Sequence, residues 1–144
     1  MESNLPNGYG RLGSLVGSVP GAGNEATLTQ PVTTRWRVIG VHIQLAADIN
    51  VANRCVNLIV QRPSGVQLTF PVNAVITASQ VRDIAWGAGV VATPLAVATA
   101  ITGTIPVDLV VNGQTTFTTR TDNIQAGDAF AAMGVVFEEW VEPL

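Results

Sequence analysis

The chain contains one histidine, His42, and one cysteine, Cys55, residue types that often serve as a general base and a nucleophile near neutral pH. A Cys55–His42 dyad would do thiol chemistry if both side chains lay on the less apolar face of adjacent strands. Catalysis would also need a carboxylate to orient the imidazole, and no motif brings one to it. We therefore interpret His42 as a surface or interface residue and Cys55 as a small core or interface residue. Because the cysteine is alone, no disulfide can form within the chain.

Oxygen-bearing side chains cluster at Asp48, Asn50 and Asn53 and could offer ligands to calcium. Counted from Asp48, the sequence lacks the glycine at the sixth position and the glutamate at the twelfth that an EF-hand loop requires. Asp and Asn side chains also accept hydrogen bonds from the backbone two residues further on, and so stabilise turns. The cluster therefore predicts an Asx turn, and we expect no metal site.

Three glutamates near the C-terminus, Glu138, Glu139 and Glu142, invite comparison with the paired carboxylates of acid–base catalysis. Consecutive residues of a strand point to opposite faces, however, so Glu138 and Glu139 would not face each other. We interpret this end of the chain as solvated or facing a partner.

Two arginines flank a tryptophan at Arg35, Trp36 and Arg37, a pattern that occurs where proteins stack on nucleic acid or sugar. The net charge of −3 disfavours nucleic acid, and Trp36 would point to the opposite face from the two arginines. Bidentate pairing of the arginines with carboxylates across a subunit boundary suits the guanidinium group better. No phosphate-binding loop, dinucleotide fingerprint or nucleophile elbow occurs. We expect no enzymatic activity, no catalytic residue and no cofactor.

The elements that would position these residues are strands. Apolar and polar residues alternate from residue 37 to 45, so that Ile39, Val41 and Ile43 share one face. The last apolar run, residues 129–141, has apolar residues on both faces near its middle, so we expect a partner, an arm or a second sheet to cover it. Turn residues separate the runs, at residues 62–65 and at Asn112-Gly113, the latter a strong hairpin signal. The predicted strands are residues 37–45, 54–62, 66–70, 81–86, 105–111, 114–121 and 129–141. The pattern predicts an all-β fold, an antiparallel β-sandwich or barrel.

Residues 1–30 differ from the rest, because glycine and proline recur too often for a helix or a long strand. Apolar side chains are nevertheless spaced through the segment, more than a flexible glycine–serine linker needs. We predict an extended N-terminal arm over residues 1–30 that lies on a neighbouring surface, followed by a β-sandwich domain over residues 31–144. A flexible tail is the alternative. The apolar residues of the arm are Leu5, Tyr9, Leu12, Leu15, Val16 and Val19.

The composition indicates a protein that associates with other polypeptides. Only 12% of the residues are charged, against about 25% in a typical domain, none of the seven cations is lysine, and 47% of the residues are hydrophobic. The sequence therefore predicts burial in an assembly. The most apolar stretch, residues 88–101, is too short for a membrane span and contains Pro94, and the first residues do not resemble a signal peptide. We expect no membrane or nucleic-acid partner, and synthesis in the cytoplasm.

Three segments resemble small jelly-roll virion proteins of tailed bacteriophages: residues 35–41 (RWRVIGV), 50–54 (NVANR) and 124–130 (IQAGDAF). The final Ala-Gly-Asp turn before a long strand is also similar to the last strand of jelly rolls that trimerise. The resemblance covers roughly residues 33–141 and excludes the arm. It implies a capsid decoration or cement protein, a homotrimer on the outer surface of the capsid that binds the major capsid protein, clamps adjacent capsomers and is made in the host cytoplasm. It transfers no catalytic residue.

Two other functions stay open at this point. The chain could be a tail, baseplate or fibre component, or a carbohydrate-binding sandwich for host attachment, which Trp36 or Trp86 exposed on a concave face would favour. An enzyme would require a polar pocket joining His42 to a carboxylate. For the assembly, the residues predicted to lie at interfaces are Leu5, Tyr9, Arg11, Leu12, Leu15, Val16, Arg35, Trp36, Arg37 and Trp140.

Overall fold

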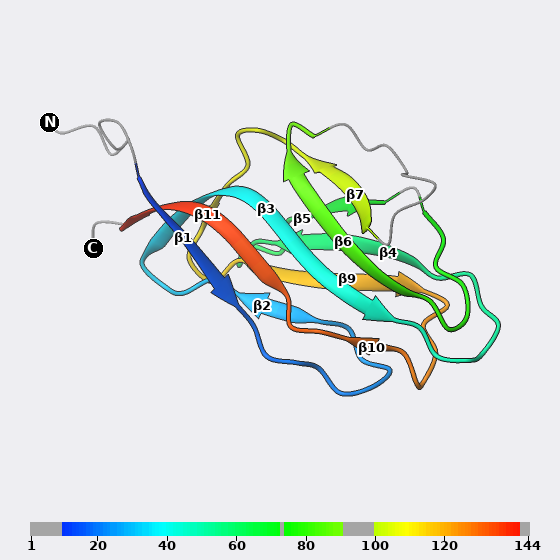
Figure 1. Cartoon of the computed structure of the whole chain (residues 1–144). Helices are drawn as coiled ribbons and strands as arrows, with labels where there is room; N and C mark the ends of the chain where they lie inside the picture. Colours follow the sequence, from blue (N-terminus) through cyan, green and yellow to red (C-terminus); the bar gives the residue numbers. More distant parts are fainter. Residues whose placement is uncertain (1–9, 73, 91–99, 142–144) are drawn as a thin grey trace, which may run out of the picture.

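The computed structural model describes residues 10–72, 74–90 and 100–141, which form two packed sheets (Figure 1). The larger sheet has the order β1-β11-β3-β6-β7, with β8 and β10 also paired to β3, and the smaller sheet has the order β2-β9-β4-β5. The larger sheet comprises β1 (Arg11–Val16), β3 (Thr34–Ala46), β6 (Val81–Ala88), β7 (Ala100–Ile105), β8 (Val110–Asn112), β10 (Ala129–Phe130) and β11 (Gly134–Val141). The smaller sheet comprises β2 (Thr27–Thr29), β4 (Cys55–Gln61), β5 (Gln67–Pro71) and β9 (Thr116–Asp122).

The predicted fold class, an all-β antiparallel sandwich, is confirmed. Every strand pair among the described residues is antiparallel except β6 with β7. The core lies between the sheets and is built from the inward-facing aliphatic and aromatic residues of both. No helix among the described residues is long and apolar enough to cross a membrane.

The face that β3 turns to the core changes along its length. Trp36 and Val38 are buried in its first half, and Val41 and Ile43 in its second. Between them the pairing with β11 shifts, which leaves Ile39 as the extra residue of a bulge and 37% exposed. A bulge inserts one residue and so reverses the alternation beyond it. The prediction that Ile39 shares the face of Val41 and Ile43 is therefore wrong.

Of the turns predicted at residues 62–65 and at Asn112-Gly113, the first forms a hairpin. Residues 62–65 join β4 to β5, with the Arg62 N–H donating to the Val66 carbonyl (2.9 Å) and Gly65 at a φ of 89° that favours glycine. Asn112-Gly113 does not join paired strands, because β8 pairs with β3 of the larger sheet and β9 with strands of the smaller one. The local turn is present, but both strands find their partners elsewhere, so the chain crosses between sheets.

The last predicted strand, residues 129–141, is interrupted. β10 ends at Phe130, and the β11 ladder starts at Gly134. This break changes the phase, so that Phe130 and Val135 are both buried while Val136 is 38% exposed. Unbroken alternation through the predicted strand 129–141 would have put Phe130 and Val136 on one face, and the break prevents this.

The N-terminal segment contributes strands to both sheets. β1 pairs with β11 at one edge of the larger sheet, and β2 pairs with β9 at one edge of the smaller sheet (Figure 1). Leu28 lies in the core, and the Glu25 carboxylate accepts hydrogen bonds from the Thr119 hydroxyl and the Thr121 N–H, both at 2.6 Å. Residues 11–16 and 27–29 therefore belong to the sandwich, although the segment was expected to be an arm. Leu5 and Tyr9 lie outside the described residues, and contact of this segment with a neighbouring molecule stays a prediction.

Candidate functional site

The larger sheet carries exposed aliphatic side chains on the face turned away from the smaller sheet. Leu12 and Val16 of β1 are 72% and 62% exposed, and Val136 of β11 is 38% exposed. In the β1–β11 register Ser14 lies opposite Val136 and Val16 lies opposite Gly134. Val136 is therefore a diagonal neighbour of Val16 on the same face of the sheet. Together with Ile39 they form what we call the outer apolar face, defined by Leu12, Val16, Ile39 and Val136.

An ion pair lies within the chain beside this face. Glu138 and Arg37 are opposite each other in the β11–β3 register, and their side chains pair. The Glu138 carboxylate is buried and also accepts a hydrogen bond from the Gly10 N–H (2.7 Å). Arg37 thus pairs with a carboxylate of its own chain, and Glu138 is not solvated. The burial of Glu138 corrects the expectation that this residue is solvated, whereas contact of Arg37 with a partner subunit stays a prediction.

The two tryptophans considered as ligand platforms are core residues. Trp36 is fully buried, stacks on Phe137 with ring centroids 3.8 Å apart, and donates its indole N–H to Glu139 Oε2 (2.8 Å). Trp86 is also fully buried and donates its indole N–H to the Phe70 carbonyl (3.0 Å). Neither ring offers a face to a sugar or to another chain, so the interface role predicted for Trp36 is corrected to a packing role.

The other predicted interface residues differ in exposure. Arg11, Leu12 and Val16 are exposed, whereas Leu15 is half-buried and packs against the core from the inner side of β1. Arg35 and Trp140 are half-buried. Of the predicted interface residues that the structure describes, those open to another molecule are therefore Arg11, Leu12 and Val16 of β1 and Arg37 of β3.

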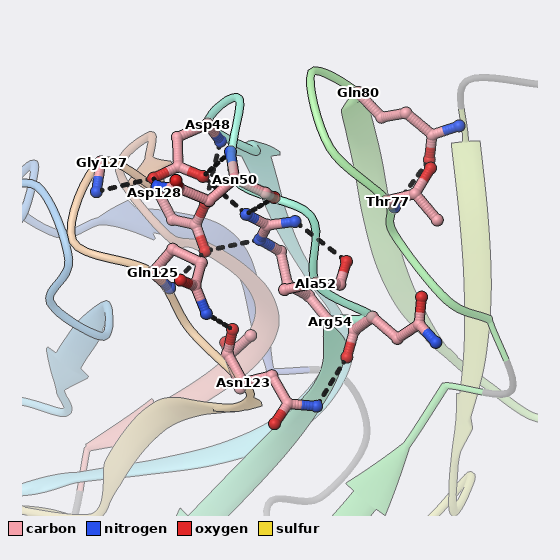
Figure 2. A network of polar contacts seen from close by, with 12 residues as sticks. Asp48, Asn50, Ala52, Arg54, Thr77, Gln80, Asn123, Gln125, Gly127 and Asp128 are labelled. Carbon is pink, nitrogen blue, oxygen red and sulfur yellow. Dashed lines mark hydrogen bonds and ion pairs between the residues drawn. The ribbon is translucent and has the colours of Figure 1, made fainter.

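A buried arginine organises one end of the sandwich (Figure 2). Arg54 is completely buried, and its guanidinium donates to Asp128 Oδ2 through Nε and to Asp48 Oδ1 through Nη2, both at 2.7 Å. Nη1 donates to the Ala52 carbonyl and Nη2 to the Asn50 carbonyl, both at 3.1 Å. A buried guanidinium is tolerated because carboxylates pair with it and its donors are satisfied.

The predicted Asx turn is present inside this network. Asp48 Oδ1 accepts a hydrogen bond from the Asn50 N–H (3.0 Å), and its Oδ2 accepts one from the Gly127 N–H (3.1 Å). The carboxylates and carbonyls that a metal would need are directed at Arg54 instead. The loop so fixed presents Ile49 and Val51 to solvent at 84% and 96% exposure.

The electrostatics of the network favour the ionised form of Asp128. Burial alone would raise the pKa of this carboxyl. Hydrogen bonds from Arg54 and from the backbone N–H groups of Asp48 and Gln125 outweigh burial and hold the Asp128 pKa below its usual range. Sequence reasoning missed the role of Arg54, although an arginine following an Asp/Asn-rich loop was a usable signal.

The structure does not bring His42 and Cys55 together. His42 is exposed on β3 of the larger sheet, where it lines a shallow hollow of about 400 Å³ with Gln44 and Asp83, and Cys55 lies in the smaller sheet. The Cys55 thiol is half-buried and donates to the Val72 carbonyl (3.3 Å). Burial, reinforced by the negative charge of Asp122, raises its pKa, which disfavours the thiolate needed of a nucleophile.

No protein-family model matches the sequence, and no curated protein is significantly similar to it. Among solved structures, the chain is similar to one described as PfGH50B, at 7% identity and a TM-score of 0.44, with 93% of this chain and 23% of that chain covered. It is similar to a chain of the T13 particle of infectious bursal disease virus, at 12% identity and a TM-score of 0.45, with 91% and 31% covered. An exo-beta-agarase gives 6% identity and a TM-score of 0.39, with 97% and 24% covered. The chain thus spans less than a third of each of these three chains, and similarity at this level identifies neither a family nor a function.

Proposed function

We propose that this protein is a structural component of a tailed-bacteriophage virion, a decoration or cement protein that binds the outer capsid surface as a homotrimer and stabilises the shell. The observation that carries the proposal is the exterior: aliphatic side chains stand exposed while several of the few charges are used internally. The resemblance of residues 35–41, 50–54 and 124–130 to small jelly-roll virion proteins is the reason for proposing a phage capsid as the assembly.

The use of charge supports association. Of seven arginines, Arg37 and Arg54 are paired within the chain, and they take up Glu138, Asp48 and Asp128 of the ten acidic residues. Soluble domains stay dispersed through a mixed and abundant surface charge, which this chain lacks. Its exterior is therefore suited to contact with protein.

Burial of apolar area supplies the binding free energy, at roughly 25 cal/mol per Å² before the costs of association are subtracted. A trimer presents three copies of each contact at once. The second and third contacts then form at a high effective concentration, so weak contacts per copy still give firm attachment to a repeating lattice.

The experiment mixes the purified chain with undecorated capsids of the phage concerned and measures occupancy by co-sedimentation. Occupancy should saturate at a fixed number of copies per capsomer and raise the temperature at which capsids rupture. No binding to capsids, or binding only to tails, would overturn the proposal and favour a tail, baseplate or fibre component. Binding to a glycan array in place of capsids would favour host attachment.

A paired set of variants tests whether exposed aliphatic residues carry the binding. I49S/V51S removes two aliphatic side chains from the loop held by Arg54, and V66S removes one from the β4–β5 turn, where Val66 is 56% exposed. Because Ile49 and Val51 are the more exposed, at 84% and 96%, and lie on a loop fixed by Arg54, we place a capsid contact there. We expect at least a tenfold loss of capsid affinity for the first variant, about 1.4 kcal/mol, and little change for the second. Equal losses would contradict a specific contact at the loop.

A deletion that tests capsid contact by the N-terminal segment must be shorter than residues 1–30. That deletion would remove Leu28 and Ala26 from the core together with both edge strands, so lost occupancy would only report unfolding. Deletion of residues 1–9 leaves β1 in place. We expect it to keep the fold and lower capsid occupancy, and unchanged occupancy would remove this segment from the contact.

A further inference from the structure

Among the described residues, β1 pairs on one side only, so its second edge, called the free edge below, has backbone groups available for pairing. Its other edge pairs with β11, and the Gly17 N–H continues that ladder by donating to the Met133 carbonyl (2.8 Å). Hydrogen-bonded and non-hydrogen-bonded residues alternate along an antiparallel pair. Counting back from Gly17, the residues that direct their N–H and C=O groups away from β11 are Leu12, Ser14 and Val16.

This edge lacks the features that protect sheet edges from pairing. Natural edge strands are kept short, carry lysine or proline, or are covered. The other edge strands among the described residues each have such a feature. β2 is only three residues long, β5 ends with a proline at Pro71, and β7 is covered by contact with β5. β1 has six residues, neither lysine nor proline, and a single charge at its first residue, Arg11. Leu12 and Val16 add exposed aliphatic side chains beside the open backbone groups.

We infer that the free edge of β1 pairs with β1 of a second copy of this chain, in an antiparallel arrangement with Ser14 on the two-fold axis. This register uses all three edge-facing residues of each copy. It places Leu12 of one copy opposite Val16 of the other, and Ser14 opposite Ser14. Arg11 falls opposite Gly17, so no like charges meet. Aliphatic cross-strand pairs of this kind stabilise a sheet, and the strand is complementary to itself.

The contact extends beyond the proposed capsid role and does not depend on it. A two-fold contact cannot close a ring of three, so in a trimeric protein it joins copies of different trimers. Two six-residue edges bury far less than the roughly 1,600 Å² of a standard interface. The contact is therefore weak between free molecules and gains strength where many copies are held side by side.

Disulfide trapping detects such a contact and reports its register. In the full chain with Cys55→Ala, a Ser14→Cys variant places two thiols on residues whose Cα atoms are about 5.5 Å apart, within disulfide range. The matched control is Leu12→Cys, whose equivalent residues lie roughly 14 Å apart across the axis. Under mild oxidation S14C should form a covalent dimer and L12C should not, whereas L12C mixed with V16C should form a mixed dimer. No dimer from S14C, or equal dimer from L12C and S14C, would overturn the inference.

A second pair of variants tests the same register without oxidation. L12K/V16K sets lysines opposite lysines and should abolish concentration-dependent association in sedimentation velocity. L12K/V16E sets lysine opposite glutamate and should restore this association.

If all variants fold, as circular dichroism would show, and sediment alike, the edge does not pair. If L12K/V16K loses capsid binding while self-association stays unchanged, the edge belongs to the shell contact and the pairing is refuted; loss of self-association with capsid binding intact supports the pairing alone.

Discussion

Arg54 shows how a charged residue becomes part of a sandwich of this kind. A lone guanidinium in a core would cost several kcal/mol, but two carboxylates and two carbonyls surround this one. The same contacts join the loop after β3 to the turn before β10 (Figure 2). The arginine thus links two loops, and its hydrogen bonds hold in place the loop that carries the exposed Ile49 and Val51.

Asp128→Asn should destabilise the chain by about 3 kcal/mol at pH 7, because it leaves a buried guanidinium with one charged partner fewer. The pKa of Asp128 is lower in the folded chain than the value of about 3.9 in the unfolded chain. Its stabilisation is therefore complete above the unfolded pKa and is lost as the pH falls through the folded pKa. Urea unfolding at several pH values should show this acid-side loss in the parent and a flatter profile in D128N. The control is D122N at an exposed carboxylate, and equal stability of D128N and D122N at pH 7 would contradict the role of the network.

Cys55 should react slowly with a thiol reagent at neutral pH in the folded chain and quickly after denaturation. Burial and the charge of Asp122 raise its pKa and so keep the thiol protonated. Asp122→Asn should lower that pKa and speed the reaction of the folded chain, as followed by the absorbance of the released product. A folded-state rate equal to that of the unfolded chain would instead indicate an accessible thiol with an ordinary pKa and would contradict this prediction.

At the scale of elements, alternation in the sequence predicted where several strands lie but not where they pair. The predicted strand at residues 105–111 is wrong, because β7 ends at Ile105 and β8 begins only at Val110. β3, β4 and β6 were anticipated from local pattern, since each buries one face against the core. The phase change at Ile39 and the break between Phe130 and Gly134 were not, because both depend on pairing with distant strands. Asn112-Gly113 likewise had the chemistry of a hairpin, and tertiary pairing overrode it.

The N-terminal segment was the largest difference, since its glycines and prolines concealed two strands. β2 holds Leu28 in the core, whereas Leu12 of β1 is mostly exposed. Leu28→Ala should therefore cost roughly 2–5 kcal/mol of unfolding free energy, and Leu12→Ala less than about 0.5 kcal/mol. Chemical denaturation of the two variants measures the difference. Similar small costs for both would mean that β2 is not part of the folded core.

At the scale of the whole molecule, the sequence predicted that the chain associates with other polypeptides, but not which residues form the contact surface. Composition alone indicated a chain with too little surface charge to stay single, and the exposed residues of β1 agree with that reading. Alternation placed Trp36 and Arg37 on opposite faces of a strand, but it could not show which of the two faces is buried, because burial depends on how the sheets pack. The pairing of Arg37 with Glu138 required the register of β3 against β11.

The central claim is that this chain covers part of its exterior with other polypeptides. The most direct test is the mass of the purified 144-residue chain in solution, measured by sedimentation equilibrium over a wide range of concentrations. We predict a mass three times the 15.0 kDa of one chain, with further growth at high concentration through the β1 edge. A mass of 15.0 kDa that persists at the highest concentration would contradict the account.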